Sequence, residues 1–158
     1  MRYPRRPVDL YAELSGIVSV LEERGIEYAL CGGIALAIHG APRATQDIDL
    51  LVRANDLDRL REAVRERGFL FEALPMDFSS SGITVHRFTK LIGDVPLMLD
   101  ALIAAGPLAA VWQTRLVAAF EQGQIHVVSK EGLITMKLAA GRPQDIADVR
   151  RLGELDRG

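Results

Sequence analysis

Two aspartates one residue apart, Asp47 and Asp49, stand in the otherwise apolar run "DIDLLV" at 47–52. Side chains at positions i and i+2 of a strand point to the same face, so both carboxylates should face one way and Ile48 the other. Aspartate is disfavoured in strands and neighbouring carboxylates repel each other, so the pair needs a local reason. A cation such as Mg2+, which prefers oxygen ligands, would supply one. The alternative is two surface aspartates, because so short a pattern also arises by chance.

A third carboxylate, Asp100, lies in a second apolar run, "VPLMLDALI" at 95–103. If the two runs are neighbouring strands, Asp47, Asp49 and Asp100 would form a two-cation site of the kind used for phosphoryl or nucleotidyl transfer. Asp94 is the rival candidate for the third position.

The glycine pair Gly32–Gly33 precedes these aspartates, where a predicted strand passes into a helix. A residue without a Cβ lets the backbone approach a ligand closely, and the free amides at a helix start favour an anion such as phosphate. The alternative is a simple tight turn. Because only a short helix and a loop separate the glycines from the aspartates, a triphosphate held at the glycines could be reached by metals at the aspartates. In that loop, Arg43 could bind a phosphate or neutralise Asp47, and Thr45 lies beside it.

The elements that must position these residues follow from hydrophobic periodicity and from capping and turn residues. We expect helices over 9–25, 34–40, 56–68, 107–123, 130–141 and 143–155, with Asp9, Asn55 and Ser129 as N-caps, and strands over 26–31, 47–52, 69–74, 83–92, 95–103 and 124–129, with a tight turn at Gly93–Asp94. Interleaved strands and helices with a central hairpin predict an α+β fold, a mixed sheet of α/β type with helices packed on it. We divide the chain into a core, 1–128, and a helical segment, 129–158, packed on the same domain.

Composition excludes several other classes. The 158 residues suit one domain, and 49% hydrophobic with 25% charged residues indicates a globular chain. The net charge of −2 provides no basic field for nucleic acid. One cysteine excludes an intrachain disulfide, and the histidines form no zinc pattern. The longest apolar stretch, 95–112, is interrupted by Asp100 and Pro107 and is a poor membrane span. We therefore expect a cytoplasmic protein with no membrane partner.

The stretch "GGIALAIHGAPRATQDIDLLV" at 32–52 resembles the nucleotidyltransferase superfamily, which shares its fold with DNA polymerase β. Among its members it looks most like the AbiEii-type and minimal nucleotidyltransferases of bacterial toxin–antitoxin and phage-defence systems. The resemblance spans about 26–149 and implies the nucleotidyltransferase fold, with the catalytic and metal-binding set Asp47, Asp49 and Asp100 and a nucleotide-binding set that begins with Gly32, Gly33, Arg43 and Thr45.

A later stretch, "MKLAAGRPQDIADV" at 136–149, is similar to the later motifs of the same superfamily. The resemblance adds Lys137 and Asp145 to the nucleotide-binding set, with Asp148 a weaker candidate. Lys137 could bind a phosphate as a point charge. Asp145, however, stands in the first turn of its helix, where the helix dipole favours a carboxylate in any case.

The resemblance implies a metal-dependent enzyme that moves a nucleoside monophosphate from an NTP such as ATP to an acceptor hydroxyl, with two Mg2+ ions, or Mn2+ in their place. The acceptor is left open between tRNA or other RNA, a protein side chain and a small molecule, and a cognate toxin or antitoxin is an expected partner. One alternative is a non-catalytic nucleotidyltransferase-like antitoxin or binding partner. A glycosyltransferase-type metal motif ranks third, because only 46 residues precede Asp47.

Overall fold

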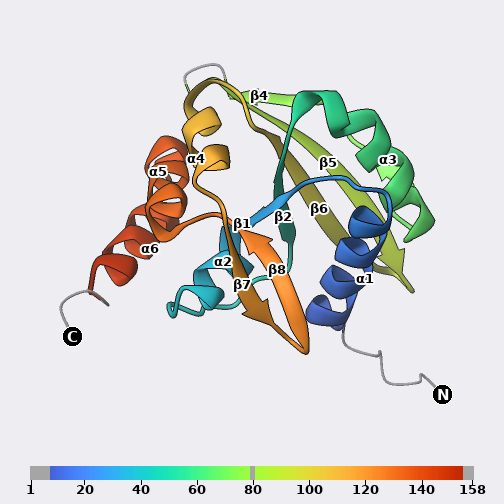
Figure 1. The fold of residues 1–158 in the computed structure, drawn as a ribbon, viewed down its shortest axis with the longest axis horizontal. Coiled ribbons are helices and arrows are strands. Elements are labelled where there is room, and N and C mark those ends of the chain that lie inside the picture. The colour runs from blue at the N-terminus through green and yellow to red at the C-terminus, as the bar shows by residue number, and fades with distance from the viewer. Residues whose placement is uncertain (1–7, 79–80, 155–158) are drawn as a thin grey trace.

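The computed structural model describes residues 8–78 and 81–154, which form one mixed sheet of eight strands with helices packed on it (Figure 1). The helices are α1 (Leu10–Glu23), α2 (Gly32–Ile38), α3 (Leu57–Glu66), α4 (Ala109–Gln113), α5 (Lys130–Ala140) and α6 (Pro143–Glu154). The strands are β1 (Ala29–Cys31), β2 (Ile48–Val52), β3 (Phe71–Glu72), β4 (Met76–Phe78), β5 (Ile83–Ile92), β6 (Val95–Ile103), β7 (Leu116–Phe120) and β8 (Gly123–Val127). The predicted fold class is confirmed.

The strand order of the sheet is β3-β5-β6-β2-β1-β8-β7, with β4 also paired to β5. The central strand β2 runs parallel to β6 and antiparallel to β1. Its residues Ile48, Leu50, Leu51 and Val52 are fully buried, because both neighbouring strands and the helices cover them. Figure 1 shows α1 and α3 together at one side of the molecule and α4, α5 and α6 grouped at the other.

Local signals in the sequence set several element boundaries. The Asp9 carboxylate accepts a hydrogen bond from the Ala12 amide at 3.0 Å and caps α1, and Ser129 caps α5 through the Gly132 amide in the same way. The hairpin turn at Gly93–Asp94 is also confirmed. The prediction for Asn55 is wrong, because a short 3-10 turn over Ala54–Asp56 precedes α3 and no side chain caps it.

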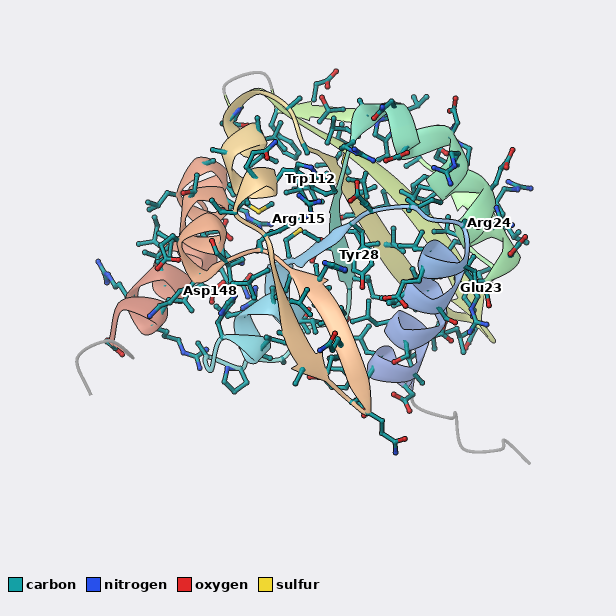
Figure 2. All side chains as sticks on the ribbon, in the orientation of Figure 1. Glu23, Arg24, Tyr28, Trp112, Arg115 and Asp148 are labelled. Carbon is teal, nitrogen blue, oxygen red and sulfur yellow. The ribbon has the colours of Figure 1, made fainter. Side chains whose placement is uncertain are left out.

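The helix predicted over 107–123 is wrong. A 3-10 turn at Gly106–Leu108 and the short helix α4 are followed by strand β7, which pairs antiparallel with β8. The chain leaves the helix beside Arg115, whose Nη1 donates to the Trp112 carbonyl at 2.8 Å and whose guanidinium lies over the Trp112 ring, 4.0 Å from its centroid (Figure 2). The alanines of "LVAAF" favour helix, but the backbone bonds offered by β8 outweigh that weak preference.

Two smaller differences matter for the site. Strand β4 was not predicted, and the strand predicted over 69–74 shortens to β3. Helix α2 begins at Gly32, so both glycines belong to its first turn rather than preceding it. Nowhere in the described part of the chain is a helix both long and apolar enough to cross a membrane.

Candidate active site

The three aspartates come together because β2 and β6 are parallel neighbours in register. Asp49 pairs with Asp100 across the two strands, and Arg87 on β5 pairs with Asp100 from the other side. Adjacent strands lie roughly 4.8 Å apart, so Asp49, Asp100 and Arg87 form one row on the sheet, and Asp47 stands just before β2. Asp94 lies in the turn at the far end of the hairpin. The register therefore favours Asp100 over Asp94 as the third carboxylate.

The three carboxylates of Asp47, Asp49 and Asp100, which we call the aspartate row together with their partner Arg87, repel one another. Burial, together with the charges of Asp100 and Asp47, raises the pKa of Asp49 to about 7. The pKa of Asp47 is also raised, first by burial and then by Asp100. Arg87 is the counter-charge: its Nε and Nη2 donate to the two oxygens of Asp100 at 2.8 and 2.9 Å, and these bonds raise the pKa of Arg87. The row thus carries more negative charge than its one arginine neutralises.

The donor chemistry of the row fits a divalent cation. Carboxylate oxygens are the ligands that Mg2+ prefers, and each carboxylate has about four lone-pair sites, so Asp100 retains acceptor capacity beside its bonds to Arg87. Among the described residues, however, no group of three or more His, Cys, Asp or Glu side chains is arranged so that it could hold a metal ion. The two-ion site of Asp47, Asp49 and Asp100 stays a prediction.

The glycine pair is explained by close packing against the aspartate strand. Gly32 has φ +69, and a Cβ there would lie 2.1 Å from Oδ2 of Asp49. A Cβ on Gly33 would lie 2.6 Å from Oγ1 of Thr45. The missing side chains therefore let the loop with Thr45 and the start of β2 lie directly on α2. Phosphate binding at the glycines stays a prediction.

The contact between Gly32 and Asp49 leads to a prediction with a matched control. Gly32→Ala and Gly25→Ala both place a side chain at positive φ, which costs about 1–2 kcal/mol, but around Gly25 there is open space within 4 Å. Gly32→Ala must in addition displace the Asp49 carboxylate, so we expect it to lower the free energy of unfolding by about 1–3 kcal/mol more than Gly25→Ala. Urea unfolding of both variants measures the difference, and equal losses would contradict the contact.

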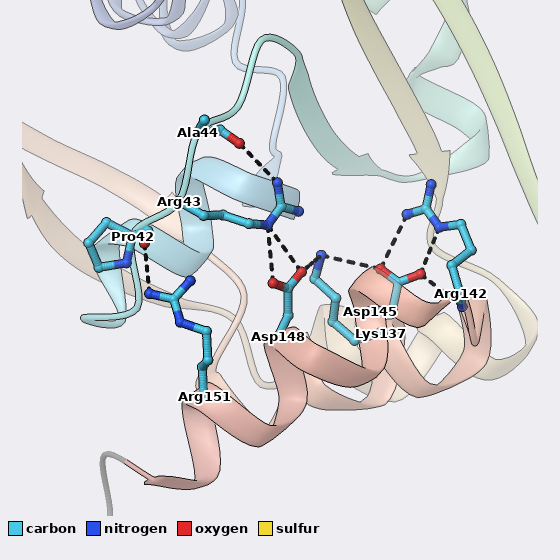
Figure 3. Close-up of polar contacts among 8 residues, drawn as sticks. All are labelled: Pro42, Arg43, Ala44, Lys137, Arg142, Asp145, Asp148 and Arg151. Carbon is cyan, nitrogen blue, oxygen red and sulfur yellow. Dashed lines mark hydrogen bonds and ion pairs between the residues drawn. The ribbon is translucent and has the colours of Figure 1, made fainter.

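The two basic side chains of the predicted nucleotide-binding set, those of Lys137 and Arg43, pair with buried aspartates of α6 (Figure 3). Lys137 Nζ lies 3.0 Å from Oδ2 of Asp148 and 3.4 Å from Oδ1 of Asp145, and all three side chains are buried. Arg43 Nε donates to both oxygens of Asp148 at 3.1 and 3.2 Å, and Arg142 Nε donates to Asp145 at 2.7 Å. Burial alone would raise the pKa of Asp145, but the hydrogen bond from Arg142 and the charges of Arg142 and Lys137 lower it overall.

This ion-pair network joins three parts of the chain that the sequence keeps apart. It connects the loop around Arg43 to α5 and α6, and Arg151 of α6 adds a bond from Nη2 to the Pro42 carbonyl at 2.8 Å (Figure 3). The network therefore positions the loop that leads into Asp47. The phosphate contacts proposed for Lys137 and Arg43 stay predictions, because both side chains already have carboxylate partners.

The aspartates, the glycine pair and part of the ion-pair network line one cavity of about 620 Å3. The weaker candidate Asp148 is not among the lining residues. All nine residues of the predicted catalytic and nucleotide-binding sets line the cavity: Gly32, Gly33, Arg43, Thr45, Asp47, Asp49, Asp100, Lys137 and Asp145. A volume of this size is typical of small-molecule sites. The structure thus gathers at one place residues that lie up to 113 positions apart in the chain.

Sequence reasoning missed several lining residues, above all Arg87 and the apolar side chains of β4 and β5. The position of Arg87 could have been predicted from the sequence. In a hairpin whose two-residue turn is Gly93–Asp94, Ile92 faces Val95, and counting back along both strands places Arg87 opposite Asp100. Strand β4 is only three residues long, and no comparable pattern in the sequence predicts it.

A central Asp-x-Asp strand, with a third aspartate beside it and a glycine-led helix against it, defines the protein as a nucleotidyltransferase by class of fold. The chain belongs to the family described as nucleotidyltransferases of unknown function (DUF6036), whose pattern matches residues 9–155. This confirms the superfamily and leaves the AbiEii-type likeness a prediction. No match is found among the curated proteins.

Solved structures of several nucleotidyltransferases have a similar fold. A candidate nucleotidyltransferase from Thermotoga maritima is 16% identical, with a TM-score of 0.61 over 92% of this chain and 91% of that one. ANT(2″)-Ia in complex with adenylyl-2″-tobramycin is 18% identical, with a TM-score of 0.62 over 92% and 88%. The lincosamide antibiotic adenylyltransferase LnuA, bound to lincomycin, is 14% identical, with a TM-score of 0.57 over 90% and 95%. At these identities the likeness shows the fold.

Proposed function

We propose that this protein transfers a nucleoside monophosphate from an NTP, with ATP as the first candidate, to an acceptor hydroxyl. The observation that carries the proposal is the in-register row of Asp49, Asp100 and Arg87, with Asp47 beside it, in a cavity bordered by Gly32 and Gly33. Structural neighbours such as ANT(2″)-Ia and LnuA, which are described with an adenylylated antibiotic and with lincomycin, support a transfer of this kind.

In the proposed reaction the acceptor oxygen forms a bond to the α-phosphorus. The bond from that phosphorus to the oxygen bridging the β-phosphate breaks, and pyrophosphate leaves. Asp47, Asp49 and Asp100 would hold Mg2+, or Mn2+ in its place, which when bound would neutralise the triphosphate and make the acceptor hydroxyl more acidic. The hydroxyl proton passes to Asp100, which keeps free lone pairs beside its bonds to Arg87.

The glycine pair, Thr45 and Arg87 would orient the nucleotide. The amides of the first turn of α2 would face the phosphates, with Gly32 and Gly33 leaving room for them. Thr45 borders the same part of the cavity. Arg87 stands next to the reacting centre and would stabilise negative charge on the phosphoryl group in transfer.

The test combines labelled transfer with binding. Each α-labelled NTP is incubated with the protein, Mg2+ and cell extract, and labelled products are separated, while calorimetry measures NTP binding with and without Mg2+. We expect Mg2+-dependent binding and label transfer, and a loss of transfer by about 10³-fold or more in the Asp47→Ala/Asp49→Ala double variant. Transfer that persists in the double variant would overturn the proposed function.

One observation favours a second candidate, a non-catalytic partner protein such as an antitoxin. Arg87 already pairs with both oxygens of Asp100, which reduces the need for a cation there. A protein of this kind would mask a cognate toxin or other partner rather than process an NTP. Calorimetry separates the two candidates, because no binding at millimolar NTP and Mg2+ would favour the partner role.

A further inference from the structure

The aspartate row continues along the same face of the sheet into an apolar surface. Alternate residues share a face, so Leu102 follows Asp100 on β6, and Val85 precedes Arg87 on β5. Register places Val85 opposite Leu102, and it places Met76 of β4 on the other side of Val85. We name the five residues that continue this face and line the cavity the apolar wall: Met76, Phe78, Ile83, Val85 and Leu102.

The apolar wall and the glycine pair lie on opposite sides of the aspartates. Gly32 follows β1, whereas the wall belongs to β4, β5 and β6, and the strand order β5-β6-β2-β1 puts the aspartate strand between them. In phosphoryl transfer the attacking and leaving oxygens stand roughly in line across the phosphorus. If the triphosphate extends toward the glycines, the acceptor hydroxyl must arrive from the side of the apolar wall.

The apolar wall contains no polar or charged side chain. Its five side chains are all apolar, and Phe78 keeps 50% of its surface exposed although it lines the cavity. The charged residues that line the cavity lie outside the wall, and each of the basic ones pairs with an aspartate. The acidic ones are the three aspartates of the site and Asp145, and the basic ones are Arg43, Arg87, Lys137 and Arg142. The wall thus carries no charge to bind a polycation or a polyanion, and its exposed aromatic ring offers an apolar contact.

We propose that the apolar wall binds the acceptor, and that the acceptor is a small uncharged alcohol with an apolar body, rather than a polycation or an RNA. The proposal rests on the proposed function, because it concerns the second substrate of the same site. The cavity of about 620 Å3 must hold the NTP as well as the acceptor, which favours a small acceptor. The hydroxyl would project from the wall toward Asp100, where it attacks the α-phosphorus, releases pyrophosphate and gives up its proton to the carboxylate.

The test compares acceptors that all carry hydroxyl groups but differ in apolar body and charge. Hexyl β-D-glucoside, glucose, tobramycin and total tRNA are each incubated with the protein, α-labelled ATP and Mg2+. We expect label on hexyl glucoside at a rate about tenfold or more above glucose, because the hexyl chain adds apolar area that the wall can bury, and no transfer to tobramycin or tRNA. Faster transfer to tobramycin or tRNA would overturn the proposal, as would ATP binding with no label on hexyl glucoside.

A matched pair of variants locates the acceptor. Phe78→Ala should lower kcat/KM for hexyl glucoside about tenfold and leave the affinity for ATP and Mg2+ unchanged in calorimetry. Phe71→Ala is the control, because Phe71 is 59% exposed on β3 and is not among the residues that line the cavity. Equal effects of the two variants would overturn the proposal. Weakened ATP binding in Phe78→Ala would also overturn the proposal, because it would place the nucleobase rather than the acceptor on the wall. Absence of ATP binding in the unaltered protein would overturn the proposed function as well.

Discussion

Replacing Asp49 by asparagine is expected to abolish nucleotidyl transfer and at the same time to stabilise the metal-free protein at neutral and alkaline pH. Asparagine has nearly the same shape but no charge, so it cannot act as a carboxylate ligand, and we expect transfer to fall by about 10³-fold or more. The same change removes a carboxylate that repels Asp47 and Asp100, which raise its pKa together with burial. Lost activity with gained stability is the signature of a site that keeps like charges together for function.

The pH dependence follows from the direction of the shift. The pKa of Asp49 is about 7 in the folded protein and about 3.9 in an unfolded chain, so the folded state binds this proton more tightly. Stability therefore falls as the pH rises from about 4 to about 7, and the full cost is present above pH 7. We expect Asp49→Asn to match the native protein near pH 4 and to exceed its free energy of unfolding by roughly 2–4 kcal/mol at pH 8.

Urea unfolding at pH 4.5 and pH 8, without divalent cations, measures this difference. Asp58→Asn is the matched control, because its carboxylate is 93% exposed and forms a surface ion pair with Arg61. Added Mg2+ should stabilise the native protein at pH 8 and leave Asp49→Asn nearly unchanged. A variant no more stable than the native protein at pH 8 would contradict the strain that we assign to the aspartate row.

Replacing Lys137 by methionine is expected to be among the most destabilising single changes in the chain. The Lys137 ammonium is the shared partner of Asp145 and Asp148, whose side chains are 1% and 2% exposed. Methionine keeps most of the volume but leaves two buried carboxylates short of positive charge, and breaking a buried ion pair from one side typically costs 3–5 kcal/mol. Because Arg43 and Arg142 remain, we expect a loss of about 3 kcal/mol and a fall of roughly 6–12 °C in Tm.

Two further variants make this prediction specific. Arg142→Met removes the other partner of Asp145, but the Arg142 side chain is 71% exposed, so we expect a loss of about 1 kcal/mol or less. Lys137→Met combined with Asp148→Asn should recover part of the lost stability, because it removes a charge that the lysine no longer neutralises. Thermal unfolding of the four proteins completes the comparison. Equal losses from Lys137→Met and Arg142→Met would contradict the central role of Lys137.

Predictions from short-range rules were the most accurate. The caps at Asp9 and Ser129 and the turn at Gly93–Asp94 depend on neighbours within a few residues, and the structure confirms all three. The helix predicted over 107–123 failed because β7 is held by β8, a partner that propensity does not see. For the glycines, the sequence predicted a close approach of the backbone to a ligand, but it could not show that Asp49 and Thr45 occupy the space of the missing side chains.

For the site, the sequence by itself determined that Asp47 and Asp49 lie close together, because a separation of two residues is a local property of the chain. Strand β2 begins only at Ile48, so the shared strand face of the two carboxylates stays a prediction. Only the tertiary structure decided that Asp100 stands beside Asp49, since that contact depends on the parallel pairing of two strands about fifty residues apart. It also decided that Lys137 and Arg43 face buried aspartates, because the packing of α5, α6 and the loop before β2 sets which charges meet. Local geometry depends on residues that are adjacent in the chain, whereas strand register and the packing of buried helices decide which charged side chains pair.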